Sequence, residues 1–532
     1  MDSHLQDTKR SSPPLNTEGA YNVVDFILQT IKQHGNEIAQ IESETKKSIT
    51  FEEIIGRVNW LGSLLVNAGI RNGDVICIIS KNSLDYSWLL LGALQAGAAC
   101  ALYSPYTKKR EIAHFVKVSK PRYVIAPEIE DEQLSVLLES DVEVIYTTFK
   151  LNHYGTKIRP YSELIIPDSE VRGSAKWKIS TCKADLDDPA LILASSGSTG
   201  LPKGVLLSHN NLVSALCHSK LLMRRSSIGL GLMPFFHAYG LGLMLMALCE
   251  GTKFITMSKF SMDKFLEIVQ TYKISNLYLV PSLVASLGKS VGATAKELSS
   301  VREIFTGAGP ITLSQQKSLL AKLHPSAKLY HSYGMTETTF VVLFGEHRED
   351  KPGSAGTLVP GIKAQIVTEN GNLVKPGQIG ELQLKGSLVM LGYFENEEAT
   401  NATKDKNGWL HTGDLVFKDI DGYYYIIDRI KELIKYQGFQ ISPTELELAL
   451  LEHKAIAEVA VIGVPHEIYG EVPKAFVVKN KGYDISENEI ISLLRSEHSS
   501  YKQLRGGVEF IEQLPKSPSG KILKKKLREL VQ

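Results

Sequence analysis

The sequence predicts an α/β protein with a large N-terminal domain and a small C-terminal α+β domain. Short β-branched runs alternate with helix-length segments through most of the chain, as where DVICIIS (74–80) precedes SLDYSWLLLGALQAG (83–97). Such alternation is typical of βαβ units, in which helices cover the faces of parallel or mixed sheets. With 532 residues, the chain is long enough to fold as several layered subdomains.

Two changes of pattern divide the chain. From about Gly353, strand-like segments such as AQIVTENGNLV and GELQLKG alternate with turn residues, which predicts a β-rich subdomain over about 353–427. A polar segment at 428–431 then precedes a helix whose start is marked by Ser442. The predicted parts are a disordered N-terminal tail (1–20), a large domain (21–427), a boundary (428–431) and a small domain (432–532).

Composition and charge exclude several classes of function. Lysine and arginine (59) balance aspartate and glutamate (58), so the formal net charge of +1 gives the chain no overall attraction to nucleic acid. The five cysteines form no CxxC pair, which argues against a disulfide framework or a cysteine-rich metal site. We expect small-molecule partners and a cytoplasmic setting, because the sequence shows neither a signal-peptide pattern nor an SKL-type peroxisomal address. The oligomeric state stays open.

Two uncharged stretches, 86–106 and 226–249, raise the question of a membrane span. The first contains Gln95 and many small residues, and the second contains Pro234 and His237. These residues favour buried helix–strand segments of a globular core over membrane helices. The sequence therefore predicts no integral membrane segment.

The most informative segment is SSGSTGLPKG (195–204), which follows the apolar run ALILA. Its glycines, hydroxyl side chains and single lysine form a flexible set of donors suited to a polyphosphate. The segment differs from the Walker pattern GxxxxGK[ST], because it has Pro202 and Gly204 at key positions. A surface turn rich in glycine and serine is the simpler alternative for this segment taken alone. The predicted phosphate-binding residues are Ser195, Ser196, Gly197, Ser198, Thr199, Gly200 and Lys203.

Three further segments carry side chains suited to a nucleotide. In YGMTET (333–338), an aromatic ring, a glycine, hydroxyls and a carboxylate could stack a purine, bind phosphate oxygens and hold Mg²⁺. Asp414 of HTGD follows a glycine and can accept hydrogen bonds from ribose hydroxyls. Lys521 of PKSPSGK follows a turn that leaves its ammonium group free. Taken alone, the first two segments are also consistent with ordinary turns.

In their order along the chain, these segments resemble the adenylate-forming superfamily, which includes acyl-CoA synthetases, 4-coumarate:CoA ligases, beetle luciferases and peptide-synthetase adenylation domains. The matching segments are SSGSTGLPKGV, PFFHAYG (234–240), TGAGP (306–310), YGMTET, GYFENEEAT (392–400), GWLHTGD (408–414), DRIKELIKYQGFQISPTELE (428–447) and PKSPSGKILKKKL (515–527). The resemblance implies that the protein uses ATP, Mg²⁺ and coenzyme A. It would activate a small carboxylic acid as its acyl adenylate and pass the acyl group to CoA.

The resemblance also implies a role for each matching residue. It places Thr336 at the phosphates, Glu337 at Mg²⁺ and His237 at the acyl substrate. The remaining nucleotide contacts are implied for Gly307, Ala308, Tyr333 and Gly334 around adenine, and for Asp414 and Arg429 at the ribose.

Two lysines of the small domain are implied for the two chemical steps. Lys521 would stabilise the charge that develops as the carboxylate attacks the α-phosphorus. Proteins of this kind then rotate a mobile C-terminal lid, here about the hinge 428–431. The rotation would bring Lys435, Gln437 and Gly438 to the site, and Lys435 is the candidate for thioester formation.

Three alternatives to a CoA ligase are weaker. GWLHTGD and LRGGVEF (504–510) resemble the luciferase branch, but Phe340 places bulk close to the TET triplet. An amino-acid-activating peptide-synthetase domain would carry an acidic residue beside the aromatic residue in 234–240, where this chain has His237, and would act with a carrier domain. A non-catalytic binding protein is disfavoured because every motif residue is present.

The acid itself is the least determined part of the interpretation. A medium- or long-chain fatty acid is the first expectation. An aryl-propenoic acid such as 4-coumarate comes second, because GELQLKG lacks the cysteine of the corresponding segment in the plant enzymes. We expect the acyl pocket around His237, Tyr239, Thr306, Gly309 and Phe340.

Overall fold

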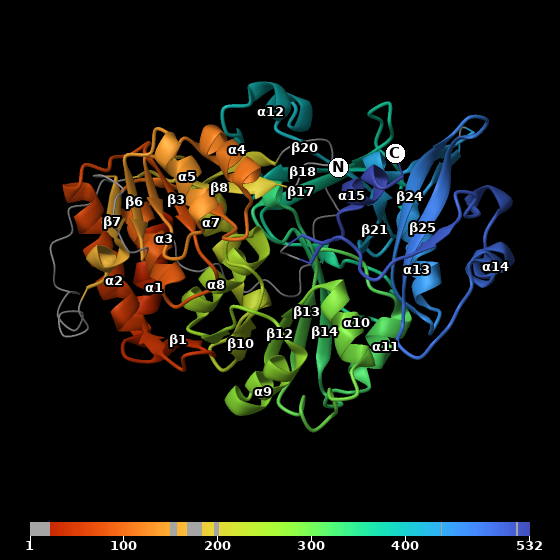
Figure 1. Cartoon of the computed structure of the whole chain (residues 1–532), viewed down its shortest axis with the longest axis horizontal. Helices are drawn as coiled ribbons and strands as arrows, with labels where there is room; N and C mark the ends of the chain where they lie inside the picture. The colour runs from red at the N-terminus through yellow and green to blue at the C-terminus, as the bar shows by residue number, and fades with distance from the viewer. Residues whose placement is uncertain are drawn as a thin grey trace.

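The computed structural model describes most of the chain. It covers residues 22–148, 157–166, 184–195, 202–437, 439–517 and 520–531. The predicted N-terminal tail (1–20) lies outside the described residues. The predicted α/β class is confirmed: layered sheets and helices form a large body, and a smaller α+β unit lies at one end of it (Figure 1).

The first sheet of the large domain contains the expected βαβ units. Its strands lie in the order β19 (Gly392–Tyr393), β9 (Lys203–Ser208), β8 (Pro189–Ser195), β4 (Ala99–Tyr103), β3 (Val75–Ile79), β5 (Tyr123–Ile125), β6 (Val144–Thr147) and β7 (Ile158–Pro160). The pairs from β8 to β7 are parallel, whereas β9 is antiparallel to both β8 and β19. β3 and β4 are buried at every position, as expected for strands covered by helices on both faces.

The second sheet positions much of the candidate site. Its strands lie in the order β16 (Thr357–Leu358), β15 (Leu343–Glu346), β14 (Lys328–Tyr333), β13 (Glu303–Thr306), β12 (Asn276–Leu279), β10 (Ile228–Gly231), β11 (Lys253–Thr256), β1 (Ile38–Glu42) and β2 (Ser48–Thr50). β10 to β14 are parallel, and Thr306 at the end of β13 pairs with His331 of β14. The segments that follow β13 and β14 therefore emerge at the same edge of the sheet.

Helices lie between the two sheets and on their outer faces. A shared core joins both sheets through α1 (Val23–Ile31), α2 (Phe51–Asn67), α3 (Asp85–Gln95), α7 (His209–Leu216) and α8 (Ala238–Glu250). The outer faces are covered by α4 (Lys109–Ser119) and α5 (Asp131–Glu139) on the first sheet, and by α9 (Met262–Tyr272), α10 (Pro281–Lys289) and α11 (Leu313–Leu320) on the second. This layering buries apolar surface on both faces of each sheet.

The two uncharged stretches form part of this core. The first contains α3 and β4, and the second contains β10 and α8; nearly every position of these helices is buried. No helix among the described residues is long and apolar enough to cross a membrane. Burial between the two sheets therefore explains the lack of charge in both stretches.

A small antiparallel sheet accounts for most of the β-rich region. Its strands lie in the order β17 (Ile362–Val367), β18 (Gly380–Gly386), β20 (Leu410–Lys418) and β21 (Tyr424–Arg429). Within the same region, β16 belongs to the second sheet and β19 to the first, and the short helix α12 (Glu397–Thr403) follows β19. The region 353–427 therefore also joins the two larger sheets to each other.

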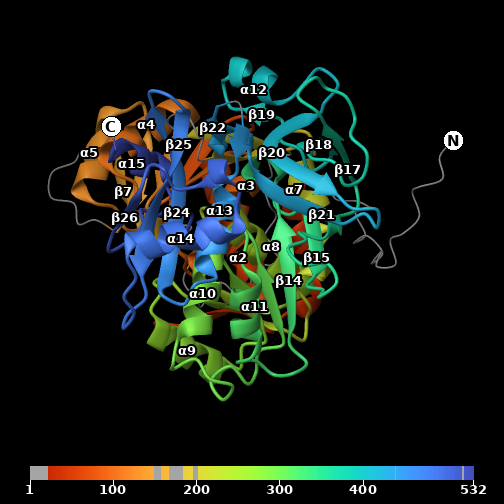
Figure 2. The same ribbon diagram turned by 90° about the vertical axis from the view of Figure 1, so that its right-hand side faces the viewer.

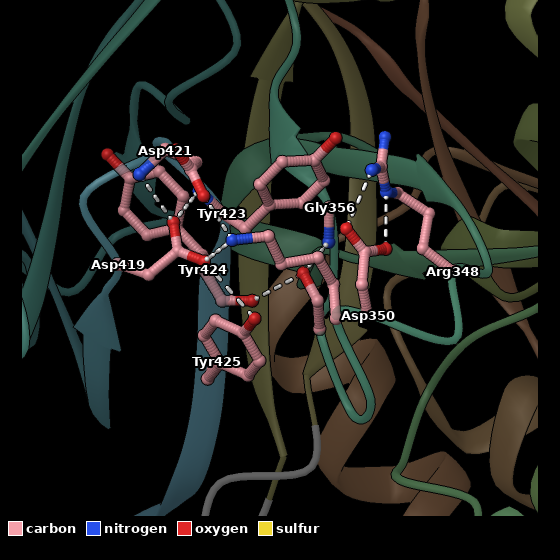
Figure 3. A network of polar contacts seen from close by, with 10 residues as sticks. Arg348, Asp350, Gly356, Asp419, Asp421, Tyr423, Tyr424 and Tyr425 are labelled. Atoms are coloured by element: carbon pink, nitrogen blue, oxygen red, sulfur yellow. Dashed lines mark hydrogen bonds and ion pairs between the residues drawn. The ribbon is translucent and has the colours of Figure 1, made fainter.

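A polar network holds this antiparallel sheet against the loop after β15 (Figure 3). The ammonium group of Lys351 lies 2.8 Å from Asp419 and also contacts Asp421 in the turn between β20 and β21. The backbone N–H of Tyr424 donates to the carbonyl oxygen of Gly356 at 2.9 Å. These bonds fix β20 and β21 relative to the second sheet, and thus fix the side chains that they carry toward the site.

The small domain is a mixed sheet packed on helices (Figure 2). Its elements are β22 (Ile434–Tyr436), β23 (Phe439–Ile441), α13 (Pro443–Leu451), β24 (Ile456–His466), β25 (Gly470–Lys479), α14 (Glu487–Glu497), β26 (Val508–Phe510) and α15 (Lys524–Glu529). Its apolar residues form clusters separate from the core of the large domain. Each domain therefore has a core of its own.

The connection between the domains is short and well bonded. Asp428, near the end of β21, accepts hydrogen bonds from the hydroxyl of Ser442 and from the backbone N–H of Thr444 at the start of α13. Ser442 also accepts from the N–H of Glu445, so it caps α13 as its sequence predicts. The last strand of the large domain and the first helix of the small domain therefore meet at one carboxylate.

Candidate active site

One pocket collects residues from distant parts of the sequence. It lies where β13, β14 and the start of α8 converge, and it contains about 570 Å³ of empty space, part of it open to solvent. Five of the predicted site residues line it: His237, Gly307, Ala308, Gly334 and Thr336. The parallel arrangement of β13 and β14 explains why the TGAGP and YGMTET segments lie together.

The backbone around this pocket needs unusual residues. A side chain at Gly334 would begin 1.7 Å from the carbonyl oxygen of Phe340, so only glycine fits there. Ala308 has a φ of +68°, a left-handed conformation that is uncommon for a residue with a side chain. Strained backbone of this kind concentrates at ligand-binding sites, where the surrounding structure maintains it.

A buried polar cluster lies beside the pocket. Asp414 on β20 and Arg429 on β21 are cross-strand partners, with 3.1 Å between an Asp414 oxygen and Arg429 Nε. The phenol of Tyr333 donates a hydrogen bond to the other oxygen of Asp414. Burial raises the pKa of Asp414, whereas Arg429 opposes that shift. The cluster therefore presents one carboxylate in a fixed orientation, as binding of a vicinal diol requires.

A second polar cluster contains Glu337, which lies in the short 3-10 helix η4 (Thr336–Thr338). The Glu337 side chain is buried, and its Oε1 accepts a hydrogen bond of 3.0 Å from the phenol of Tyr393. The ammonium group of Lys203 lies 4.6 Å from the centre of the Tyr393 ring. Tyr393 was missed by the sequence analysis, although it belongs to the GYFENEEAT segment quoted there.

Lys521 extends from the small domain toward the same region. Burial lowers its pKa to about 8, and the nearby Arg429 adds to this shift, while Asp414 and Glu337 oppose it. Lys521 is nevertheless exposed to solvent, and it is not among the residues that line the pocket. Lys521 therefore lies within electrostatic range of both polar clusters.

His237 caps the N-terminus of α8 at the pocket. Its Nδ1 accepts a hydrogen bond of 3.4 Å from the backbone N–H of Tyr239, so the ring carries its proton on Nε2. Burial, together with a smaller contribution from the charge of Lys521, lowers the pKa of His237 to about 4. The imidazole is therefore neutral at physiological pH and offers one N–H donor.

The deeper wall of the pocket is mostly apolar. It contains Leu222, Ala238, Gly242, Leu243, Met246, Phe340 and Val341. A side chain at Gly242 would begin 2.8 Å from the Phe340 ring, so this glycine makes room for the ring. Of the residues expected around the acyl group, His237, Tyr239 and Phe340 line the pocket, whereas Thr306 and Gly309 are not among its lining residues.

The remaining predicted residues lie elsewhere or outside the described part of the chain. Ser195 is buried at the end of β8 and pairs with Lys203 of β9. Lys435 and Gln437 are exposed on the small domain and do not line the pocket. Six of the predicted residues lie outside the described residues: Ser196, Gly197, Ser198, Thr199, Gly200 and Gly438.

Comparison with known families identifies the class of enzyme to which this fold belongs. The chain belongs to the AMP-binding enzyme family: the family model matches residues 27–394, and the model of the C-terminal domain of AMP-binding enzymes matches residues 445–521. Members of this family use ATP and CoA. The protein is thus an AMP-forming acid–thiol ligase, one of the adenylate-forming acyl- and aryl-CoA ligases.

Its relatives cover nearly the whole chain. A 4-coumarate–CoA ligase of Vanilla planifolia is 34% identical over 517 residues, which span 94% of this chain and 92% of the relative. The peroxisomal OPC-8:0-CoA ligase 1 of Arabidopsis thaliana is 34% identical over 532 residues, 98% of this chain and 95% of the relative. The crystal structure of ATP-bound MatB from Rhodopseudomonas palustris superposes with a TM-score of 0.84 at 26% identity, covering 96% of this chain and 99% of that one.

Proposed function

We propose that this ligase activates a monocarboxylic acid with an apolar body, with a medium- or long-chain fatty acid as the first candidate. The observation that carries the proposal is the apolar pocket, which opens beside His237 and within reach of the Lys521 charge. Among the described lining residues there is no lysine, arginine or acidic side chain to pair with a second charge on the substrate. The acid would therefore enter with its tail in the pocket and its carboxylate toward Lys521.

An aryl acid is the second candidate. Tyr239 and Phe340 provide aromatic surfaces along the pocket, and aromatic rings pack well against an aryl group. Two relatives whose names specify 4-coumarate and OPC-8:0 as substrates show that related chains act on acids of different shape.

The residues around the pocket suit ATP in the same cleft. We assign the adenine to Tyr333, Gly334, Gly307 and Ala308, and the ribose to Asp414 and Arg429. Thr336 and Lys203 would contact the phosphates. The support for this assignment is that Tyr333 and Arg429 both bond Asp414, which fixes the diol-binding carboxylate beside the adenine wall.

Glu337 suits a magnesium ion bound to the phosphates. One of its oxygens accepts a hydrogen bond from Tyr393, and no other described residue bonds the second oxygen, which could therefore bind a cation. Mg²⁺ commonly takes one or two carboxylates together with phosphate oxygens and water. When bound there, the ion would neutralise charge on the phosphates during transfer.

In the first half-reaction, a carboxylate oxygen of the acid attacks the α-phosphorus, and the bond to pyrophosphate breaks. Negative charge builds up on the α-phosphate oxygens, and Lys521 is placed to stabilise it. His237 stays neutral, so it does not form an ion pair with the acid, and its Nε2–H can orient the carboxylate. The product is the acyl adenylate.

In the second half-reaction, the thiol of CoA attacks the acyl carbonyl and AMP leaves. This step needs space where Lys521 now lies. We propose that the lid (432–532) rotates on the adenylating domain (21–427) about residues 428–431, which withdraws Lys521 and brings Lys435, Gln437 and Gly438 to the site. Separate hydrophobic cores support this motion, because neither core has to open.

A panel of acids tests the proposed substrate. A chain-length series of saturated acids, 4-coumarate and a dicarboxylic acid are each incubated with ATP and CoA, and AMP and acyl-CoA are measured by chromatography. We expect apolar monocarboxylic acids to give AMP and acyl-CoA in equal amounts, with the dicarboxylic acid inactive. A preference for the dicarboxylic acid would contradict the apolar-pocket assignment.

A further inference from the structure

Tyr393 connects two side chains that the proposed mechanism places on ATP. Its phenol donates to Glu337 Oε1 at 3.0 Å, and its ring lies under the ammonium group of Lys203 at 4.6 Å. Lys203 and Glu337 are 134 positions apart in the sequence, so their relative position depends on tertiary contacts. Tyr393 bonds or packs against both of them.

The surrounding backbone fixes the position of Tyr393. β19 is antiparallel to β9, with Tyr393 opposite Val205, two residues beyond Lys203. The N–H of Tyr393 donates to the hydroxyl of Thr400 at 2.8 Å, and the N–H of Met390 donates to the carbonyl oxygen of Glu337 at 2.9 Å. The short strand therefore ties the Lys203 strand to the turn that carries Glu337.

The hydrogen bond from Tyr393 occupies only one of the two oxygens of Glu337. The phenol donates to Oε1 at 3.0 Å. Among the described residues, Oε2 has no hydrogen-bond partner, so it keeps its lone pairs for another ligand.

We propose that Tyr393 is a positioning residue for the metal–nucleotide complex, which holds the Glu337 carboxylate in the orientation that binds Mg²⁺ on ATP. The inference rests on the proposed role of Glu337. Groups that hydrogen-bond a metal-binding carboxylate fix its direction, and their loss typically weakens metal binding or activity by about 10–100-fold. The cation–π contact with Lys203 does not depend on the hydroxyl, so the two contacts of Tyr393 can be separated.

The variant Tyr393→Phe removes the hydroxyl and keeps the ring under Lys203. Binding of ATP is measured by isothermal titration calorimetry without the acid substrate, once with Mg²⁺ and once with EDTA. We expect affinity in Mg²⁺ to fall by about 10-fold, with affinity in EDTA unchanged. Equal affinity of the variant and the wild type in Mg²⁺ would overturn the proposal, as would equal losses under both conditions.

Two further variants distinguish a failure of the role proposed for Tyr393 from a failure of the role proposed for Glu337. Glu337→Gln should lose the Mg²⁺-dependent part of ATP binding, and adding Tyr393→Phe to it should cause no further loss. If Glu337→Gln binds Mg²⁺–ATP normally, the proposed metal role of Glu337 fails. If only Glu337→Gln has an effect, the role of Tyr393 fails and that of Glu337 stands.

Tyr161→Phe is the matched control. Tyr161 is buried, and its phenol donates to Asp85 at 2.8 Å, so the change removes the same type of bond away from the pocket. We expect this variant to lower the thermal midpoint while leaving the Mg²⁺ dependence of ATP binding unchanged. An equal loss of Mg²⁺-dependent binding in Tyr161→Phe would show that general destabilisation explains the effect.

Discussion

The small domain carries two lysines in contrasting environments. Both are exposed, but Lys521 lies among charged groups of the large domain: desolvation by the surrounding protein and the charge of Arg429 lower its pKa, while Asp414 and Glu337 oppose that shift. Lys435 is exposed on β22, where its backbone N–H donates to Glu471 at 2.8 Å. In this arrangement Lys521, the lysine proposed for adenylation, is the one that lies near Asp414 and Glu337. Lys435, the lysine proposed for thioester formation, would reach them only after a movement of the small domain.

The contacts between the domains are compatible with such a movement. The ammonium group of Lys289, at the end of α10, donates to the carbonyl oxygen of Ile456 at 3.0 Å and lies 3.4 Å from Asn480 Oδ1. These are polar contacts at the domain surfaces, and the apolar cores do not merge. At this part of the surface, hydrogen bonds that could be exchanged for others therefore join the two domains, in addition to those that Asp428 makes at the connection.

The largest effect is expected for Lys521→Ala. Loss of one preorganised charge at the reacting phosphate should slow acyl-adenylate formation by about 10²–10³-fold, measured as acid-dependent exchange between pyrophosphate and ATP. Thioester formation from a supplied acyl adenylate should continue at the wild-type rate. Lys525→Ala, on an exposed neighbour, is the control. Equal losses in both half-reactions would contradict the division of roles.

Lys435→Ala should have the opposite pattern. Pyrophosphate exchange should persist, while production of the CoA thioester should fall by about 10²-fold, the lower end of the scale for one positioned catalytic group. Lys481→Ala, another exposed lysine of the small domain, serves as the control. A loss of exchange in Lys435→Ala would place this lysine in the first step.

The lowered pKa of Lys521 predicts that the rate of adenylation falls at alkaline pH. The ammonium must be protonated to stabilise phosphate charge, and its pKa is lowered to about 8. The rate of pyrophosphate exchange should therefore be maximal below about pH 8 and fall by about tenfold per unit above it. In Lys521→Arg this fall in rate at alkaline pH should disappear, because the guanidinium group stays charged throughout that range. If the rate of the arginine variant fell in the same way above about pH 8, the pH dependence would belong to another group.

The smallest effect is expected for Lys289→Met. Removing the hydrogen bonds to the small domain should weaken the present domain arrangement and slow adenylation by about threefold, the scale of a partly exposed charged hydrogen bond. Thioester formation from acyl adenylate should not slow. Lys296→Met changes an exposed lysine nearby and should leave both half-reactions unaffected. A slower thioester step in Lys289→Met would show that its contacts serve both arrangements.

Much of the fold follows from local patterns in the sequence. Alternating strands and helices predict the layered α/β body, and parallel pairing of β13 with β14 explains why Gly307 and Gly334 line the same pocket. Residues such as Pro234 and His237 correctly favour a buried core over a membrane span.

The contacts between distant segments could not be read from the sequence. Tyr393 meets Glu337 only because a strand of two residues pairs with β9, and no periodic pattern marks so short a strand. The shape of the pocket proposed for the acyl group depends on Gly242, and the sequence of its helix gives no sign that an aromatic ring packs against this glycine. Thr306 and Gly309 belong to the TGAGP segment and were expected there, but only Gly307 and Ala308 of that segment line the pocket.

The proposed rotation of the small domain between the two half-reactions is tested most directly by measuring a distance between the two domains. Spin labels are attached at Val291→Cys in the large domain and Ile468→Cys in the small domain, two residues that are 93% and 72% exposed. Cys182 and Cys217 are replaced by serine in the same protein. Pulsed electron paramagnetic resonance then measures the distance between the two labels. We predict one distance with ATP alone and a second, distinct distance with a stable acyl-adenylate analogue and CoA. A single unchanged distance under both conditions would contradict the rotation of the lid and the division of labour between Lys521 and Lys435.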